Sequence, residues 1–171
     1  MALQAKLVLL GPMGAGKSTI GKLLATNLDW PYFDNDEEMA KMSGLTATEL
    51  SLLSVADLHL YESQYLKELC AKPAPFIAGA AASVVDYRAN LELLKSVTPI
   101  YLRITLDQVL ERAGGAGIGR TNIGSDLSDV LTERFTRRDP IYTSVAKLTV
   151  ELSSEPEVDA AQILEFLARL V

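Results

Sequence analysis

The stretch GPMGAGKST, residues 11–19, decides the fold of this chain. It holds a glycine, four further residues and then Gly-Lys-Ser, a pattern that binds nucleotide phosphates when a strand precedes it and a helix follows. Both conditions are met, because the apolar run KLVLL (6–10) predicts a buried strand and the apolar residues from Ile20 to Leu28 recur with helical spacing. The alternative is a glycine-rich turn with a chance lysine, and the matched flanks disfavour it.

This loop is expected to bind ATP and Mg²⁺. Its glycines allow backbone N–H groups to face the phosphates, while the Lys17 ammonium contacts the β- and γ-phosphates and the Ser18 hydroxyl ligates the metal. The helix that follows presents its positive end to the same phosphates. The residues expected to contact the nucleotide here are Gly11, Met13, Gly14, Ala15, Gly16, Lys17, Ser18 and Thr19.

Beyond the loop, short apolar runs alternate with segments of helical spacing. These runs are WPYF (30–33), PFIA (75–78), TPIYLRI (98–104) and AKLTVEL (146–152). Together with the first strand, the alternation predicts an α/β fold, in which a five-stranded parallel sheet lies between two layers of helices. We find no repeat or linker and therefore interpret residues 1–171 as a single domain.

The composition restricts partners and compartment. A formal net charge of −6 argues against a general nucleic-acid surface, which needs clustered lysine and arginine. Cys70 is the only cysteine, so it forms no internal disulfide, and its place on an apolar helical stripe predicts a buried thiol. The run at 6–10 is far too short to span a membrane. We expect a monomeric cytoplasmic protein with neither membrane nor nucleic-acid partners.

Two aspartates in FDND, Asp34 and Asp36, follow the second apolar run. They should emerge at the carboxyl edge of the sheet, where open α/β sheets bind ligands. One carboxylate can hold Mg²⁺ through water while the other accepts a proton from an attacking hydroxyl. Alternatively, Asp36, Glu37 and Glu38 form an acidic cap at a helix N-terminus. We favour function for the two aspartates and the cap for the glutamates.

Two segments do not resemble packing elements. Residues 34–50 predict short helices broken at Ser43-Gly44, in a small acceptor-binding excursion that extends to about residue 62. The glycine-rich GGAGIGRTNIG (114–124) predicts a mobile lid over about residues 113–124. Its Arg120 is a candidate clamp for the transferring phosphate, with a solvated surface arginine as the alternative.

The segment ERFTRRDPIY (133–142) contains further candidate cations. It predicts a helix that stops before Pro140, with Arg134, Arg137 and Arg138 near its C-terminus, where cations complement the helix dipole. One of the three arginines is a candidate for facing the site. Spacing alone does not distinguish which one.

Taken together, GPMGAGKSTIG, FDND, a lid with one arginine and RRDPIY resemble the shikimate kinase family over nearly the whole chain. The resemblance implies a P-loop kinase fold of the nucleoside-monophosphate-kinase type. It implies that Arg112 stacks on adenine and that Arg138 binds the carboxylate of the acceptor. It implies further that Lys17 and Ser18 bind ATP and Mg²⁺ and that Asp34 contacts the waters of the metal. It also implies that Asp36 contacts the acceptor hydroxyl and that Arg120 contacts the transferring phosphate.

Two departures from the family pattern fall at the acceptor pocket. Family members carry Gly-Gly-Gly where this chain has Ala80-Ala81-Ala82, and Phe-Arg where it has Leu58-His59, followed by Glu62. Three methyl groups would fill space beside the acceptor, and an alanine forced to positive φ would cost about 1–2 kcal/mol, so we expect a turn of changed shape.

An unperturbed histidine, with a pKa of about 6.5, is mostly neutral at pH 7. Losing the arginine of the family would therefore weaken binding of a small carboxylate by about one to two powers of ten. For His59 itself, direct contact with the acceptor and simple pairing with Glu62 one turn away both stay open.

Three functions are compatible with these residues. The leading hypothesis is an ATP- and Mg²⁺-dependent kinase that phosphorylates a hydroxyl of a small molecule other than shikimate. The second is a nucleotide-binding regulatory protein without acceptor chemistry, and the third is an ordinary shikimate kinase. Asp36, Arg120 and Arg138 favour chemistry over binding alone, because a nucleotide sensor needs no acceptor-side groups.

Overall fold

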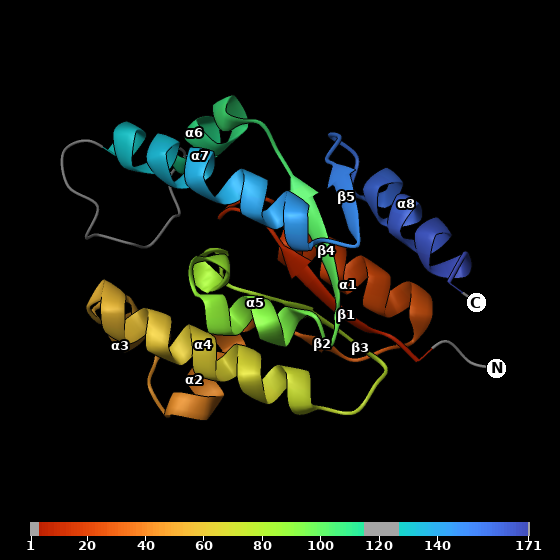
Figure 1. Cartoon of the computed structure of the whole chain (residues 1–171), viewed down its shortest axis with the longest axis horizontal. Coiled ribbons are helices and arrows are strands. Elements are labelled where there is room, and N and C mark those ends of the chain that lie inside the picture. The colour runs from red at the N-terminus through yellow and green to blue at the C-terminus, as the bar shows by residue number, and fades with distance from the viewer. Residues whose placement is uncertain (1–3, 115–126, 171) are drawn as a thin grey trace.

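The centre of the molecule is a five-stranded parallel sheet with the strand order β2-β3-β1-β4-β5 (Figure 1). The structure is a computed structural model that describes residues 4–114 and 127–170. Each described strand overlaps one of the five apolar runs, so the predicted α/β fold is confirmed. The strands are β1 (Lys6–Leu10), β2 (Tyr32–Phe33), β3 (Phe76–Gly79), β4 (Thr98–Arg103) and β5 (Leu148–Glu151).

Helices cover both faces of this sheet, as the alternating pattern predicted. In Figure 1, α1 (Lys17–Leu28) and α8 (Pro156–Ala168) lie on one side, and α4 (Val55–Ala71) and α5 (Arg88–Leu94) lie on the other. The remaining described elements are α2 (Asn35–Ser43), α3 (Ala47–Ser51), the 3-10 helix η1 (Ala82–Asp86), α6 (Leu106–Gly114) and α7 (Leu127–Val145).

The side chains of β1 divide the interior into two apolar cores. Leu7 and Leu9 pack in the core that contains residues of α1 and α8, whereas Val8 and Leu10 pack in the core that contains residues of α4 and α7. Successive strand residues point to opposite faces, so a strand buried on both sides must be apolar throughout. The uninterrupted run KLVLL is explained by this double burial.

The predicted break at Ser43-Gly44 is confirmed. Helix α2 ends at Ser43, and Gly44 adopts φ 72°, a left-handed conformation that glycine reaches without a Cβ clash. Thr46 then caps α3, in a capping box with Glu49. Two short helices therefore stand between β2 and α4 at the edge of the sheet.

The prediction that a helix stops before Pro140 is wrong, because α7 continues through this proline to Val145. A proline inside a helix removes one backbone hydrogen bond. Contacts on both sides of the proline compensate: Asp139 accepts a hydrogen bond of 2.8 Å from Tyr101, and Tyr142 stacks on the same Tyr101 ring. Arg134, Arg137 and Arg138 consequently lie within the helix and not at its C-terminus.

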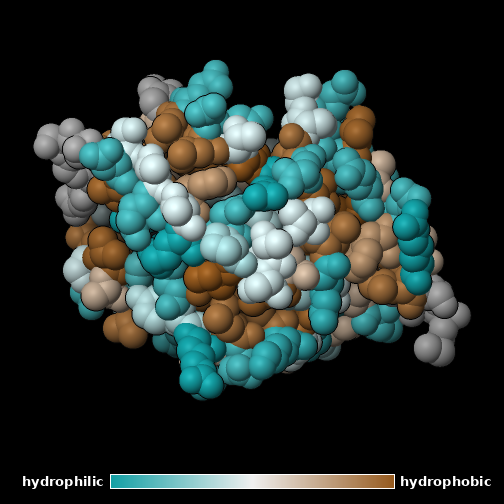
Figure 2. All heavy atoms as spheres, turned by 45° about the horizontal axis from the view of Figure 1, so that its top comes forward, coloured by the Kyte–Doolittle hydropathy of each residue, from teal (hydrophilic) through white to brown (hydrophobic). Residues whose placement is uncertain are grey.

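The mixed surface and the buried cysteine match what the composition indicated. Hydrophilic and hydrophobic residues are interspersed on the face shown in Figure 2. Among residues 4–114 and 127–170, no helix has both the length and the apolar character needed to cross a membrane. Cys70 is buried, as its position on an apolar stripe predicted.

Candidate active site

The phosphate-binding loop joins β1 to α1 at the carboxyl edge of the sheet. Gly11 has φ 149°, and a Cβ there would lie 2.7 Å from the carbonyl oxygen of Leu102. Gly16 has φ 82° and stands at the N-cap of α1, which no described side chain caps. The backbone N–H groups of the first turn therefore face the loop without a side-chain acceptor, the arrangement that binds an anion at a helix N-terminus.

Lys17 lies across this loop. Its Nζ donates hydrogen bonds of 2.8 Å to the carbonyl oxygen of Gly11 and 2.9 Å to that of Pro12. These bonds hold the ammonium group over the turn of the loop. A positive charge thus stands beside the N-terminus of α1, where phosphate oxygens would also meet the backbone N–H groups.

Asp34 uses its two carboxylate oxygens for different contacts. Oδ1 accepts a hydrogen bond of 3.0 Å from the backbone N–H of Asp36 and so caps α2, while Oδ2 accepts one of 2.7 Å from Ser18 Oγ. Burial raises the pKa of Asp34, but hydrogen bonds from Ser18 and from the backbone of Asp36 and Glu37 together hold it below its ordinary value. The side chain is therefore ionised at neutral pH. Asp34 is the N-cap of α2, and the acidic residues predicted at this helix N-terminus, Asp36, Glu37 and Glu38, form its first turn.

Ser18 and Asp34 fit the ligand preferences of Mg²⁺. This ion takes oxygen ligands and is usually held by one or two carboxylates together with substrate phosphates, not by a complete protein cage. Within residues 4–114 and 127–170, no three His, Cys, Asp or Glu side chains cluster in a way that could hold a metal. The hydroxyl and carboxylate beside the loop match the incomplete protein ligand set that Mg²⁺ takes with a nucleotide.

Asp36 lies in the first turn of α2, two residues beyond the cap. Its side chain is exposed, and its Oδ1 accepts a hydrogen bond of 3.0 Å from Asn35. Because Asp34 fixes the start of α2, Asp36 stands at the same edge of the sheet as Lys17 and Ser18. A carboxylate in this position is open to a molecule that approaches from solvent.

Arg112 joins the site from α6. Its Nη1 donates a hydrogen bond of 2.5 Å to the carbonyl oxygen of Gly14, so a second cation reaches the phosphate-binding loop. The adenine contact assigned to it by resemblance stays a prediction. Arg120 and the predicted lid beyond the end of α6 lie outside the described residues.

The three alanines after β3 do not occupy one environment. Ala80 and Ala81 are 1% and 8% exposed and belong to an apolar core, whereas Ala82 is half-buried and begins η1. Among the described non-glycine residues, only Asp29 has a positive φ. The chain therefore makes this turn without the strain that left-handed alanines would bring.

The end of β3 approaches the phosphate-binding loop directly. A Cβ on Gly79 would lie 3.9 Å from the Cβ of Lys17 and 3.1 Å from the hydroxyl of Tyr32. The hydroxyl of Tyr32 in turn donates to Asp34 over 3.3 Å. The turn that carries the alanines thus begins beside Lys17 and Asp34.

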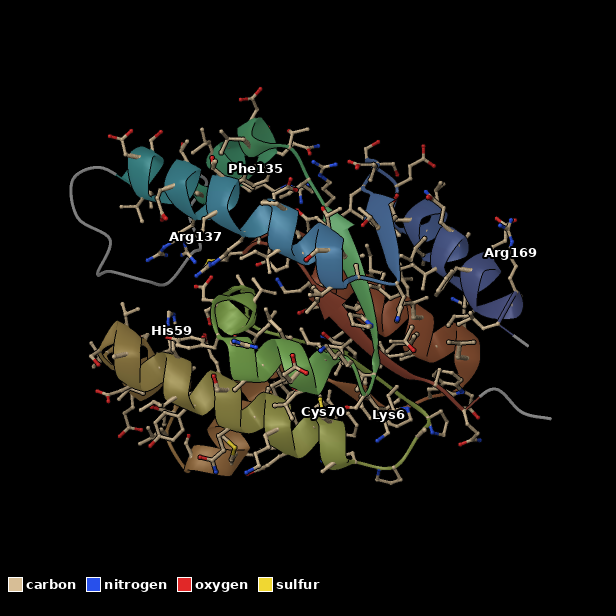
Figure 3. All side chains as sticks on the ribbon, viewed as in Figure 1. Lys6, His59, Cys70, Phe135, Arg137 and Arg169 are labelled. Atoms are coloured by element: carbon tan, nitrogen blue, oxygen red, sulfur yellow. The ribbon has the colours of Figure 1, made fainter. Side chains whose placement is uncertain are left out.

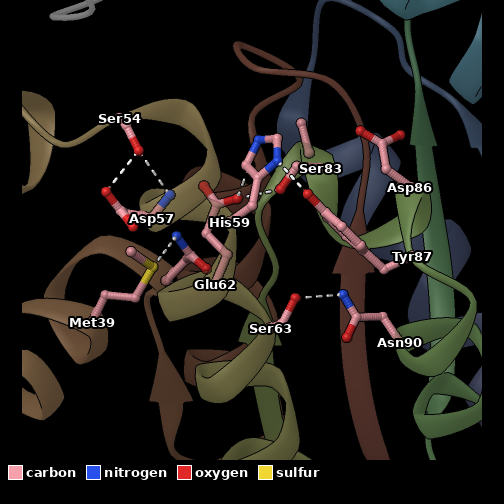
Figure 4. Close-up of polar contacts among 12 residues, drawn as sticks. Met39, Ser54, Asp57, His59, Glu62, Ser63, Ser83, Asp86, Tyr87 and Asn90 are labelled. Carbon is pink, nitrogen blue, oxygen red and sulfur yellow. Dashed lines mark hydrogen bonds and ion pairs between the residues drawn. The ribbon is translucent and has the colours of Figure 1, made fainter.

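Helix α4 holds η1 from one side (Figure 4). His59 Nδ1 lies 2.8 Å from the hydroxyl of Tyr87, and its Nε2 lies 3.9 Å from Oε2 of Glu62. Glu62 is buried, and it accepts a hydrogen bond from the Ser83 hydroxyl. The pairing of His59 with Glu62 is therefore present, together with a contact to Tyr87 that the sequence pattern did not indicate.

Helix α7 holds η1 from the other side. Arg138 donates from Nε to Oδ1 of Asp86 over 3.0 Å and from Nη2 to Oδ2 over 2.6 Å. Arg137 Nη1 donates to Oδ1 of the same carboxylate over 2.5 Å. In Figure 3, Arg137 on α7 lies above His59 on α4, in the same part of the view.

Sequence reasoning missed Asp86. It precedes Arg138 by 52 residues and belongs to no motif, so nothing local indicated the pair. The three arginines in residues 133–142 could have prompted a search for carboxylates that pair with them, but they could not have identified Asp86.

Comparisons with known proteins agree with this geometry. The family model described as shikimate kinase matches residues 13–168. A shikimate kinase of Rhodococcus jostii (strain RHA1) is 31% identical over 160 residues, which cover 93% of this chain and 95% of the relative. A shikimate kinase of Pseudomonas syringae pv. syringae (strain B728a) is 31% identical over 165 residues, covering 96% and 95% of the two chains.

Solved structures show the same similarity. A shikimate kinase from Acinetobacter baumannii in complex with shikimate has a TM-score of 0.86 and 25% identity, and the match covers 98% of this chain and 95% of that one. A shikimate kinase from Aquifex aeolicus has a TM-score of 0.79 and 28% identity, with coverage of 95% and 96%. The similarity extends over the whole sheet and its helices.

Proposed function

Because the chain belongs to the shikimate kinase family and is an ATP-dependent small-molecule kinase, we propose that it phosphorylates a hydroxyl of a small molecule other than shikimate, with Mg²⁺ as cofactor. The observation that carries the proposed site is the junction of Ser18 and Asp34 beside Lys17. It brings a cation, a hydroxyl and an ionised carboxylate to the N-terminus of α1, the groups that phosphoryl transfer from a nucleotide requires.

On the donor side, the backbone N–H groups of residues 11–16 and the start of α1 bind the phosphates. Lys17 contacts the phosphate oxygens and stabilises the charge that develops on them during transfer. Ser18 and Asp34 would hold Mg²⁺, with Asp34 assigned to the waters of the ion by the family resemblance, and the ion would supply positive charge that neutralises the phosphates. Arg112 stacks on the adenine ring, and Arg120 contacts the phosphoryl group as it transfers.

On the acceptor side, Asp36 accepts the proton of the attacking hydroxyl. Its exposure at the start of α2 supports this role, because the acceptor must reach it from solvent. His59, Ala82 and Arg138 border the acceptor on the η1 side, with Ala80 and Ala81 behind them in the apolar core. A nucleotide sensor would need none of these groups, so kinase chemistry is favoured over the regulatory alternative.

Two observations support an acceptor other than shikimate. His59 offers at most one donor at each ring nitrogen, and Nδ1 already contacts Tyr87 at 2.8 Å. It therefore supplies no planar two-donor fork for a carboxylate, as an arginine does. In addition, Ala82 is half-buried at the start of η1, and its methyl group takes up room that a glycine would leave free.

Shikimate itself is the second candidate acceptor. It is favoured by the relatives named shikimate kinase at 31% identity and by the shikimate complex of the Acinetobacter baumannii protein. The two candidates differ in one measurement, which is the turnover of shikimate by the unmodified protein with saturating ATP and Mg²⁺.

The test combines that assay with a screen of small-molecule pools for ATP-dependent mass gains of one phosphate. Little turnover of shikimate together with phosphorylation of another hydroxyl compound is the expected result. Robust turnover of shikimate would instead assign the second function. The predicted monomeric state and cytoplasmic location stay predictions and do not affect this assay.

A further inference from the structure

Asp86, Arg137, Arg138 and Glu133 form a charge-balanced cluster between η1 and α7. Asp86 accepts hydrogen bonds from both Arg137 and Arg138. The second carboxylate, Glu133, accepts a hydrogen bond of 2.9 Å from Arg137 Nε. The central pair is the more enclosed, since the side chain of Arg138 is 10% exposed and that of Asp86 is 12% exposed. Two guanidinium groups thus meet two carboxylates.

The Asp86–Arg138 pair lies at the acceptor side of the site. Tyr142, one helical turn after Arg138, donates a hydrogen bond of 2.6 Å to the carbonyl oxygen of Ala82, which fixes this face of α7 against η1. The strand that leads into η1 ends at Gly79 beside Lys17. The pair therefore borders the same end of the sheet as the proposed catalytic residues.

Asp86 occupies the nitrogen atoms with which Arg138 could bind the carboxylate of a ligand. Arg138 uses Nε and Nη2 in two parallel bonds to Asp86, the fork through which arginine binds carboxylates. Burial raises the pKa of Asp86, but hydrogen bonds from Arg138 and Arg137 hold it below its ordinary value, so the carboxylate is ionised at neutral pH. A ligand carboxylate would have to displace Asp86 from Arg138 and would then stand beside the negative charge of Asp86, which only Arg137, already shared with Glu133, would still offset.

We propose that Asp86 determines acceptor specificity by supplying, from within the chain, the carboxylate that Arg138 binds, so that the acceptor is an uncharged polyol and not a hydroxy acid. This inference rests on the proposed function, because it assumes that the acceptor lies beside η1. The site then selects a compound that turns hydroxyl groups, and not an anionic group, toward η1.

The test compares two probes that differ in one charge, shikimate and its uncharged methyl ester. Binding of each probe is measured by calorimetry with Mg²⁺ and ADP present, for the unmodified protein, Asp86→Asn and Glu133→Gln. The last is a matched control, because it removes a carboxylate from Arg137 in the same cluster but leaves the Asp86–Arg138 fork in place. Thermal unfolding and ADP binding report whether each variant is folded.

The unmodified protein and Glu133→Gln should bind shikimate no more tightly than the ester. Asp86→Asn should shift the ratio of affinities toward shikimate by about 10- to 100-fold, because the freed fork forms charge-assisted bonds with the ligand carboxylate. If Asp86→Asn is not folded, Asp86→Ser is used with the same expectation.

Three outcomes would overturn the inference. They are a preference of the unmodified protein for shikimate of tenfold or more, an unchanged ratio in the folded Asp86 variant, and an equal shift in Glu133→Gln. Absence of any gain in shikimate binding counts as an unchanged ratio. The readout needs no turnover, so failure of the proposed phosphoryl transfer, seen as retained turnover in Asp36→Asn, is distinguishable from failure of this inference.

Discussion

Ser18 Oγ donates a hydrogen bond of 2.7 Å to Asp34 Oδ2, and this bond joins the first turn of α1 to the N-cap of α2. The two residues belong to different motifs, the phosphate-binding loop and the segment FDND. Their contact places the proposed metal ligand and the start of the acceptor-side helix in one rigid unit. Any change at Asp34 should therefore affect both the stability of α2 and the response to Mg²⁺.

For Asp34→Ala, we expect the free energy of unfolding to fall by about 1 kcal/mol, because α2 loses its N-cap. ATP binding should also lose most of its dependence on Mg²⁺. The matched control is Thr46→Ala, which removes the N-cap of α3 and should cost a similar amount while leaving the Mg²⁺ dependence intact. Calorimetric titration of ATP at several Mg²⁺ concentrations gives the comparison. An unchanged Mg²⁺ response in Asp34→Ala would remove Asp34 from the metal site.

For Lys17→Ala, we expect the affinity for ATP with Mg²⁺ to fall by at least about tenfold, because the ammonium across the loop is lost. Lys22→Ala is the control, since Lys22 is exposed on the same helix, outside the loop. Both variants should unfold at similar temperatures. Equal ATP affinity in Lys17→Ala and the unmodified protein would refute the assignment of the loop as the phosphate site.

For Asp36→Asn, turnover should fall by about 10²–10⁴-fold while ATP affinity stays nearly constant, because the carboxylate acts on the incoming hydroxyl and not on the nucleotide. Glu37→Gln removes the neighbouring charge of the same helix turn and should have little effect on turnover. Slow ATP hydrolysis by water serves as the assay until the acceptor is known. Full activity of Asp36→Asn would exclude it as the base.

A variant with His59→Arg and with Ala80, Ala81 and Ala82 all changed to Gly tests the shape of the acceptor side. The arginine introduced at position 59 supplies a fork that Asp86 does not occupy, so we expect the variant to gain phosphorylation of shikimate that the unmodified protein lacks. Its free energy of unfolding should fall by about 1–3 kcal/mol, because glycine increases the conformational freedom of the unfolded chain. The triple Ala→Gly variant without His59→Arg is the control. Absence of gain in a folded, ATP-binding variant would argue against these four positions as the acceptor determinants.

The pKa of Asp86 leads to a prediction for acid stability. Because the folded-state pKa lies below the ordinary value, ionised Asp86 stabilises the fold above the ordinary carboxyl pKa, and this contribution is lost as the pH falls through the lowered value. The unmodified protein should therefore be more stable than Asp86→Asn at pH 7. That difference should shrink as the pH falls below about 4. Urea unfolding at pH 3, 5 and 7 measures it, and a difference that grows toward pH 3 would contradict the expectation.

The sequence by itself determined the sheet, the phosphate-binding loop and the break at Ser43-Gly44. Each of these depends on local properties: the continuous apolar runs of doubly buried strands, the spacing of glycines and lysine in 11–19, and the φ that Gly44 allows. The position of Asp34 and Asp36 at the carboxyl edge also followed, because a parallel sheet brings the ends of its strands to one side.

Only the tertiary structure decided the surroundings of η1 and the course of α7. The helix continues through Pro140 because Asp139 and Tyr142 contact Tyr101, on a distant strand, and Arg138 is paired because Asp86 reaches it from 52 residues earlier in the chain. Local propensity describes the intrinsic preference of a segment, whereas these features depend on contacts between side chains far apart in the sequence. The acceptor side therefore depends on tertiary packing, whereas the nucleotide side could be predicted from the local motif of residues 11–19.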